Sequence, residues 1–322
     1  MTLDLIDGKL LYMLDCNARQ SLSVIAKKLR VSRSVILYRI NRLKSKGIIK
    51  GSFAEVNNFA LGFLSFRICI KLGNFSSTQE ESLIRFVRQQ KNIMWFSRVL
   101  GSWDLDIVFM AKNLSAFIAF KEELFLRYNN MFDDADISIL SRMYHYPKNY
   151  LANTKRDIIE KRVIEETMHT QIDDIDVHIL SLLASDAQMT IIDLAEKTGI
   201  AVNTVMKRMR SLEKSGIILG YRLLLDTNAL GYQINKVHIV LKNYSQETYK
   251  QFLYYCESKS SVIYIDQYLG GADFEIELHL KNDSEYILFI EDLEKHFSKI
   301  IKSKIFIKFY KVYAFRYLPY MD

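Results

Sequence analysis

The sequence has few cysteines, and their spacing excludes two classes of site. Cys16, Cys69 and Cys256 are the three cysteines among 322 residues. They lie 53 and 187 residues apart, which matches neither a structural zinc motif nor a disulfide framework and is typical of a reducing compartment. The chain also lacks the run of about 18 apolar residues that a membrane helix requires. Asp4 and Asp7 interrupt the apolar character of the N-terminal segment, so it does not resemble a signal peptide. We therefore expect a cytoplasmic protein with no membrane contact.

Acidic residues are absent from one stretch of 30 residues near the N-terminus. From Ser21 to Lys50 the sequence contains nine Lys or Arg residues and no Asp or Glu. Ile36, Ile40 and Leu43 recur within this stretch at helical spacing, so we expect a basic helix that buries one face. A charge run is usually a solvated face. An imbalance of this size, however, also favours an anionic partner.

Catalytic signatures are absent as well. The six histidines form no cluster with metal-ligand spacing, and the sequence contains no phosphate-binding loop, dinucleotide fingerprint or nucleophile elbow. We therefore expect neither an enzyme nor a cofactor, and no metal site.

The chain is instead an internal repeat with an offset of 169 residues. Between residues 6–62 and 175–231, 16 of 57 aligned positions are identical. Gly47-Ile48-Ile49 is repeated at Gly216-Ile217-Ile218, and Gly101 and Asp104 are repeated at Gly270 and Asp273. An unbroken register over about a hundred residues indicates two copies of one unit.

Each copy opens with three helical patterns and then changes period. Two short helices joined by a tight turn, with a first helix as support, predict a helix-turn-helix. The order that follows is β-α-β-β-α-β, with one face of the sheet covered by both helices, as in ferredoxin-like domains. Pro147 and Pro319 follow the last strand of each copy, where a missing N–H is tolerated.

The predicted fold class is therefore α+β, a tandem duplication of a winged-helix-like helix-turn-helix and a ferredoxin-like domain. We place the helix-turn-helix domains at residues 1–52 and 172–221 and the ferredoxin-like domains at 58–147 and 227–320. The charged segment 148–171 between the copies predicts a helical linker.

These motifs resemble those of the Lrp/AsnC family of feast/famine transcription regulators. Leu5-Ile6-Asp7, the basic segment from Ser32 to Gly51 and Asn57…Leu61-Gly62 are similar to the family's helix-turn-helix and its connection to the sensing domain. Gly101-x-x-Asp104 and Gly270-x-x-Asp273 are similar to the turn between the second and third strands of that domain. The resemblance covers nearly the whole chain twice, whereas family members usually carry one unit.

The resemblance implies a regulator that binds double-stranded DNA with the second helix of each helix-turn-helix. Arginine can pair bidentately with guanine in the major groove, and the flanking cations neutralise phosphates. The candidate contacts in the first copy are Ser32, Arg33, Ser34, Tyr38, Arg39, Arg42 and Lys44. Those in the second copy are Asn203, Thr204, Lys207, Arg208 and Arg210.

The second copy is less basic than the first. From Thr190 to Leu219, five Lys or Arg residues face three Asp or Glu residues, a net charge of +2 against +9 for the first copy. The second unit either reads DNA weakly or mainly supports a pseudo-dimer. Unequal readers favour an asymmetric operator.

The resemblance also implies assembly and an effector. We expect an internal pseudo-dimer through the two sheet domains, with further homo-oligomerisation. Gly101, Asp104, Gly270 and Asp273 are candidate residues for an amino-acid-like effector. The alternative is that each aspartate only hydrogen-bonds its own turn.

One enzyme class shares this arrangement. Siroheme decarboxylases resemble the family and occur as paired or fused units, in which an Arg-His segment near the second and third strands serves the tetrapyrrole substrate. The corresponding segments here, 95–101 and 264–270, contain no histidine. The basic helix of the first copy also favours DNA binding over this alternative.

Overall fold

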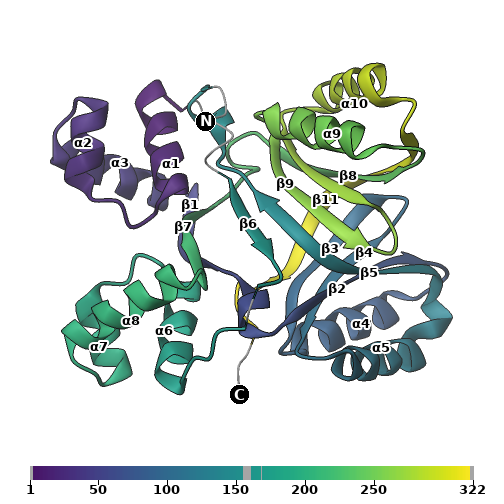
Figure 1. The fold of residues 1–322 in the computed structure, drawn as a ribbon, viewed down its shortest axis with the longest axis horizontal. Coiled ribbons are helices and arrows are strands. Elements are labelled where there is room, and N and C mark those ends of the chain that lie inside the picture. Colours follow the sequence, from purple (N-terminus) through teal and green to yellow (C-terminus); the bar gives the residue numbers. More distant parts are fainter. Residues whose placement is uncertain (1–2, 155–160, 168, 320–322) are drawn as a thin grey trace.

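A computed structural model describes residues 3–154, 161–167 and 169–319. Two small helical units lie side by side at one end of the molecule, and a large β-domain flanked by helices forms the other end (Figure 1). Within the described ranges, no helix combines the length and the apolar character needed to cross a membrane.

The first helical unit is a helix-turn-helix, as predicted. It consists of α1 (Leu5–Cys16), α2 (Leu22–Leu29) and α3 (Arg33–Ser45). The carboxylate of Asp4 accepts the N–H of Asp7 and caps α1, which satisfies a backbone donor that the helix itself leaves unpaired. Arg30 ends α2 in the left-handed conformation, with φ of 56°.

The second helical unit repeats this arrangement with α6 (Asp174–Ser185), α7 (Ile191–Thr198) and α8 (Val202–Lys214). Gly199 stands at the position of Arg30 and adopts the same left-handed conformation, with φ of 70°. Glycine takes this conformation without a steric cost, which is why it commonly ends helices.

Two wing strands join the helical units. β1 (Ile49–Val56) pairs antiparallel with β7 (Ile218–Leu225), and one hydrophobic core runs from α1 through these strands to α8. Ala18 N–H donates to Tyr221 O, and at the repeat-related positions Ala187 N–H donates to Ser52 O. The two helical units are therefore fixed to each other about a pseudo-two-fold axis.

The β-domain contains both predicted βαββαβ units. The first has β2 (Leu64–Leu72), α4 (Ser77–Gln89), β3 (Ile93–Gly101), β4 (Leu105–Ala111), α5 (Leu114–Tyr128) and β5 (Phe132–His145). The second has β8 (Gln233–Leu241), α9 (Gln246–Ser258), β9 (Val262–Leu269), β10 (Phe274–Leu280), α10 (Asp283–Phe297) and β11 (Ile301–Phe315).

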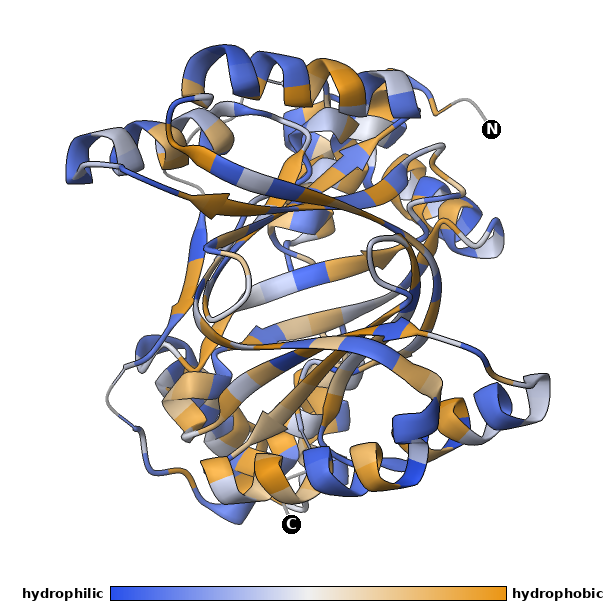
Figure 2. Cartoon of the chain, turned by 90° about the vertical axis from the view of Figure 1, so that its right-hand side faces the viewer, coloured by the Kyte–Doolittle hydropathy of each residue, from blue (hydrophilic) through white to orange (hydrophobic). Residues whose placement is uncertain are grey.

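The two sheets join into one closed ring of strands. β3 pairs with β11 and β5 pairs with β9 across the two copies, while β2 pairs with both β4 and β5. Viewed from the side, the strands enclose a barrel, with helices on opposite outer faces (Figure 2). The outer faces of the strands pack against α4 and α5 in one core and against α9 and α10 in another.

The inner face of the barrel carries buried charges in repeat-related pairs. Arg67 contacts Asp106 of its own copy at 2.5 Å and also forms an ion pair with Glu275 of the other copy. Lys236 stands at the position of Arg67 and contacts Asp266 at 2.9 Å and Glu275 at 3.3 Å. Removing one partner from such a buried pair is strongly destabilising, because it leaves a charge unpaired in a medium of low polarity.

The predicted helical linker is wrong in its described part. Arg162–Glu165 form a short strand, β6, which pairs with the end of β5 from Arg142 to His145. β5 leaves an edge there that can accept a further strand, and this pairing overrides the weak helical periodicity of the segment. Residues 155–160 and 168 of the predicted linker lie outside the described residues.

Candidate nucleic-acid interface

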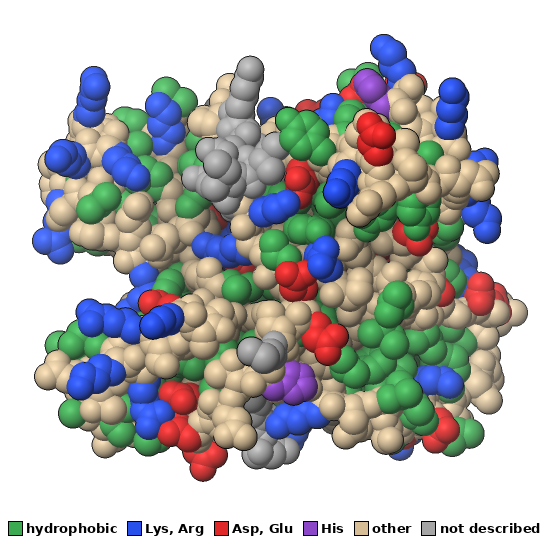
Figure 3. Space-filling view, viewed as in Figure 1, with side chains coloured by type: hydrophobic (Ala, Val, Ile, Leu, Met, Phe, Trp, Pro, Cys, Tyr) green, Lys and Arg blue, Asp and Glu red, His purple; other side chains and the backbone are tan. Residues whose placement is uncertain are grey.

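α3 presents a basic and exposed face to solvent. Ile36, Ile40 and Leu43 point into the core, as the helical spacing predicts. The opposite face carries the predicted contacts Arg33, Ser34, Tyr38 and Lys44, all exposed. Lys and Arg side chains lie over both helical units, which a notch separates (Figure 3).

The first turn of α3 carries two exposed hydroxyl groups. The Ser32 hydroxyl accepts the N–H of Val35 at 3.3 Å, and it lies 2.8 Å from the Ser34 hydroxyl. Both residues are exposed. Hydroxyl groups and free N–H groups at a helix N-terminus are common phosphate ligands in protein–DNA contacts.

Arg39 and Arg42 lie against α1 instead of facing solvent. Arg39 contacts Asp4 at 2.6 Å and Asp7 at 2.7 Å, and Arg42 contacts Asp7 at 2.5 Å. The side chain of Asp7 is only 2% exposed. These two arginines therefore neutralise a buried carboxylate and hold α3 onto α1. A helical repeat alone does not show whether an arginine on the flank of the basic face turns outward or back onto a neighbouring helix.

The second helical unit has corresponding ion pairs. Arg208 contacts Asp173 at 2.8 Å and Asp176 at 3.0 Å, the repeat-related partners of Asp4 and Asp7. The other predicted contacts on α8 are exposed: Asn203, Thr204, Lys207 and Arg210.

The predicted effector residues lie in the two turns that precede β4 and β10. The Asp104 carboxylate accepts the N–H of Leu72 at 2.9 Å, and the Asp273 carboxylate accepts that of Leu241 at 2.6 Å. Gly101, with φ of 129°, lies so close to β11 that an added Cβ would be 2.1 Å from Phe306 O. Gly270 similarly faces Ile137 O. These contacts give all four residues a role in the turns, and effector binding by them stays a prediction.

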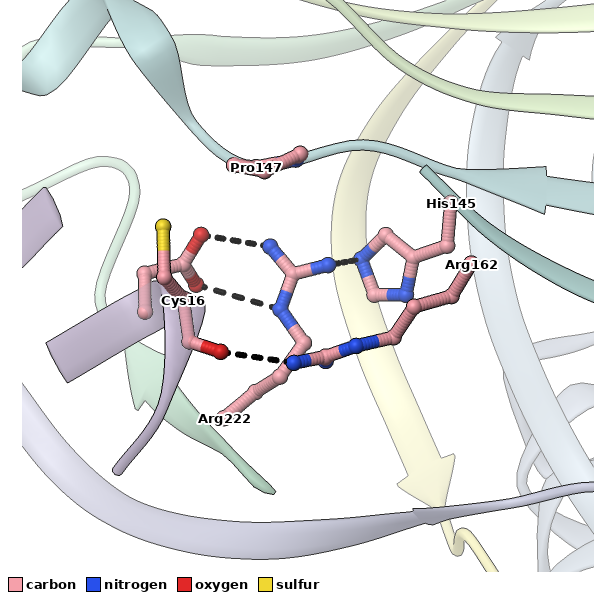
Figure 4. Close-up of a pocket in the computed structure, with 6 residues that line it drawn as sticks. Cys16, His145, Pro147, Arg162 and Arg222 are labelled. Atoms are coloured by element: carbon pink, nitrogen blue, oxygen red, sulfur yellow. Dashed lines mark hydrogen bonds and ion pairs between the residues drawn. The ribbon is translucent and has the colours of Figure 1, made fainter. Parts of the chain in front are cut away.

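A cavity of about 180 Å³ lies where α1, β5, β6 and β7 meet. Its walls are Asp15, Cys16, His145, Pro147, Arg162 and Arg222 (Figure 4). The charged side chains are turned toward one another. Arg222 donates to Asp15 at 2.5 Å and to the ring of His145, and Arg162 donates to Glu55 at 2.7 Å and to Cys16 O at 2.6 Å.

The protonation of His145 follows from these neighbours. Burial and the guanidinium of Arg222 lower the pKa of His145 to about 3, so its imidazole is neutral near pH 7. Because Arg222 donates to Nε2, the other ring nitrogen carries the proton and donates to Glu55. Burial would raise the pKa of Asp15, but Arg222 and Lys148 outweigh it and hold that pKa well below its ordinary value. The cavity is therefore lined by groups that already have partners.

The sequence prediction missed this junction. The sequence feature that could have revealed it is a departure from the repeat. Four charged or polar residues of the junction have apolar residues at the related positions: Ala184 for Asp15, Leu224 for Glu55, Phe53 for Arg222 and Ala314 for His145. On that side Phe53 stacks on Tyr317 and packs edge-on against Phe315. One helical unit is thus joined to the barrel by ions and the other by aromatic rings. In the described part of the chain, no group of three or more His, Cys, Asp or Glu side chains is placed to hold a metal ion.

Comparison with known proteins identifies the helical units. The family model described as winged helix-turn-helix DNA-binding matches twice, at residues 3–50 and 172–218. The glutamate uptake regulatory protein of Zymomonas mobilis is 35% identical over 120 residues, 37% of this chain and 73% of that protein. The leucine-responsive regulatory protein of Rhizobium meliloti is 33% identical over 124 residues, 38% of this chain and 80% of that protein.

A solved structure shares the complete two-copy fold. The siroheme decarboxylase NirDL superposes with a TM-score of 0.66 over 98% of this chain and 94% of that chain, at 12% identity. At this identity the likeness establishes the fold and not the activity.

The ion pairs of α3 predict that two of its arginines differ in their contribution to stability. Arg39→Ala leaves the buried Asp7 short of a partner, so we expect the free energy of unfolding to fall by about 1–3 kcal/mol. Arg33→Ala removes an exposed side chain and should change it by less than about 0.5 kcal/mol. Urea denaturation followed by circular dichroism measures the free energy of unfolding of both variants. Arg208→Ala tests the repeat-related ion pairs in the second helical unit. Equal stability of the Arg33 and Arg39 variants would contradict the assignment.

The junction predicts a loss of stability in acid. Below the ordinary His pKa of 6.5, the unfolded chain takes up a proton at His145 and the folded chain does not. The stability that the neutral His145 contributes is therefore fully present above about pH 7 and is lost as the pH falls toward 3. In His145→Gln, an amide with matching hydrogen-bond geometry, the loss between pH 7 and 5 should be smaller by about 2 kcal/mol. Urea midpoints at the two pH values test this, and an unchanged pH dependence would show that His145 is charged when folded.

Proposed function

The chain belongs to the Lrp/AsnC family of transcription regulators, and from this premise we propose that it binds specific double-stranded DNA sites, chiefly through α3. The observation that carries the proposal is the exposed face of α3, in a segment with nine cations and no acidic residue. An α-helix fits the major groove, and the cations around it neutralise phosphates.

The exposed side chains of α3 divide into two tasks. Arg33 and Tyr38 are exposed on α3, and we propose that they reach base edges. Tyr38 is 66% exposed although it is aromatic, which favours a partner on this face. Lys44 near the end of the helix and the hydroxyls of Ser32 and Ser34 at its start are suited to phosphate contacts.

The pairing of β1 with β7 holds both reading helices in one rigid unit. This is the symmetry with which a dimeric helix-turn-helix protein reads two half-sites. The surroundings of the two helices are unequal, however, because α3 lies in a segment with a net charge of +9 and α8 in one with a net charge of only +2. We infer that the operator has a strong half-site for α3 and a weaker one for α8.

Further assembly is part of the proposal. The internal pseudo-dimer uses β3, β5, β9 and β11, so pairing between chains must use other surfaces. Leu100 and Leu269 are repeat-related, lie at the ends of β3 and β9 and are 54% and 67% exposed. Paired apolar side chains of this kind favour contacts between chains, and light scattering of the purified protein measures the stoichiometry.

The unequal helices predict unequal effects on DNA binding. Arg33→Ala with Lys44→Ala should weaken operator binding more than tenfold and reduce its salt dependence, because phosphate neutralisation is lost. The matched pair Lys207→Ala with Arg210→Ala on α8 should weaken it by less. Gel-shift titrations at two salt concentrations compare the pairs, and urea midpoints confirm that each variant is folded. If the two double variants lose operator binding equally, or if neither loses it, α3 is not the dominant DNA-binding helix.

A second candidate function is suggested by the fold of NirDL, which matches 98% of this chain. A tetrapyrrole decarboxylase would bind a siroheme-type substrate and release carbon dioxide. We propose that this chain is not such an enzyme, because α3 keeps its exposed basic face and the segments 95–101 and 264–270 contain no histidine. Anaerobic incubation with siroheme decides between the two: carbon dioxide release would establish the enzyme.

A further inference from the structure

A second cavity, of about 310 Å³, lies between the two halves of the barrel. Its walls come from both copies, and six of the ten lining residues form three repeat-related pairs. Trp103 is related to Ala272, Asp134 to Ser303, and Asp136 to Ile305. A cavity lined by both members of these pairs lies close to the pseudo-two-fold axis. It is therefore a single site whose two sides have different chemistry.

One side of the cavity is acidic. Asp134 and Asp136 are two residues apart on β5, so both side chains point to the same face of the strand. Neither carboxylate forms an ion pair with a Lys or Arg of the described residues. Gly271 leaves room for the acid, since a Cβ at that position would lie 2.4 Å from Asp136 Oδ2. Burial raises the pKa of Asp136, and the positive charge of Arg67 offsets this rise only in part.

His238 adds a buried polar group to the same cavity. It is 4% exposed, and its Nε2 makes no hydrogen bond to any described residue, with Glu275 Oε2 as far as 3.6 Å away. Burial and the nearby charges of Arg67 and Lys236 lower its pKa, so the imidazole is neutral and can hydrogen-bond a ligand. A buried polar atom without a partner is costly unless a ligand or water satisfies it.

The remaining wall is apolar. Trp103, Val240 and Ile305 contribute an indole ring and branched aliphatic groups. No lysine or arginine side chain is among the residues that line this cavity. A ligand carboxylate would therefore find no cation among the lining residues and would be repelled by two aspartates.

We propose that this cavity binds a small organic cation, a primary amine or diamine of about four to six carbons that has no carboxylate. The ammonium group lies between Asp134 and Asp136, the alkyl chain packs against Trp103 and Val240, and a second polar end hydrogen-bonds His238. An ammonium is also attracted by the face of an indole ring. The volume suits a ligand of this size.

This site differs from the turn residues in the way it recognises charge. The carboxylates of Asp104 and Asp273 accept N–H groups of Leu72 and Leu241 on other strands. The Asp134 carboxylate accepts the N–H of the adjacent Ala135 at 2.8 Å, and both Asp134 and Asp136 line the cavity. Because β5 and β11 belong to different copies, a bound amine contacts both halves of the pseudo-dimer. The inference does not depend on DNA binding, which is measured separately on the same variants.

The test uses the full chain and calorimetric titration with 1,4-diaminobutane and 1,5-diaminopentane. Ornithine and lysine are the same molecules with a carboxylate added, so they are the matched ligands. We expect each diamine to bind at least tenfold more tightly than its amino acid. Asp136→Asn should weaken diamine binding at least tenfold, and the matched control Asp133→Asn, exposed on the same strand and outside the cavity, should leave it within twofold.

A second variant covers the case in which Asp136→Asn does not fold. Ser303 is exposed and faces the acidic side, so Ser303→Lys supplies an internal ammonium group and should abolish diamine binding in a folded protein. The proposal is overturned if no diamine binds, if the amino acids bind as tightly, or if Asp133→Asn weakens binding as much as Asp136→Asn. Intact DNA binding in the same variants would show that such a failure concerns this cavity alone.

Discussion

The pairing of strands across the two copies is the constraint on which the rest of the structure depends. β3 with β11 and β5 with β9 close the two ferredoxin-like sheets into one barrel. Inside it, Arg67 is shared between Asp106 of its own copy and Glu275 of the other. Ions buried in this way are stabilising only when all partners are in place, which favours one arrangement of the two halves over any slipped one. The fixed barrel in turn places the two wing strands where β1 and β7 can pair.

A duplication on one chain frees the two halves to diverge. In a homodimer a substitution appears on both sides of the axis, whereas here each position changes alone. The chain uses this freedom in three places. The junction is ionic around Arg222 and aromatic around the related Phe53, the second cavity has acid on one side only, and the segment 21–50 that contains α3 has a net charge of +9 against +2 for the segment 190–219 that contains α8. The symmetry is kept in the backbone and broken in the side chains.

The sequence was sufficient for the elements and for their order. Helical and strand periodicity predicted the β-α-β-β-α-β order that both copies adopt, because each element buries one face against a core. It was not sufficient for features set by distant contacts. β6 forms only because the end of β5 offers an edge, and Arg39 turns to Asp7 only because α1 packs across α3. The residues that line the two cavities are brought together by the closed barrel and by the wing strands. No local sequence pattern predicts these long-range contacts.

The central claim is that one chain reads an asymmetric DNA site, with α3 as the dominant reader. Selection of bound sequences from a random DNA pool, followed by footprinting of the enriched site, tests this most directly. The account predicts a motif with one strong half-site, which the Arg33→Ala and Lys44→Ala changes erase while the weaker half-site persists. A perfect palindrome with both halves equally constrained, or no enriched motif at all, would contradict it.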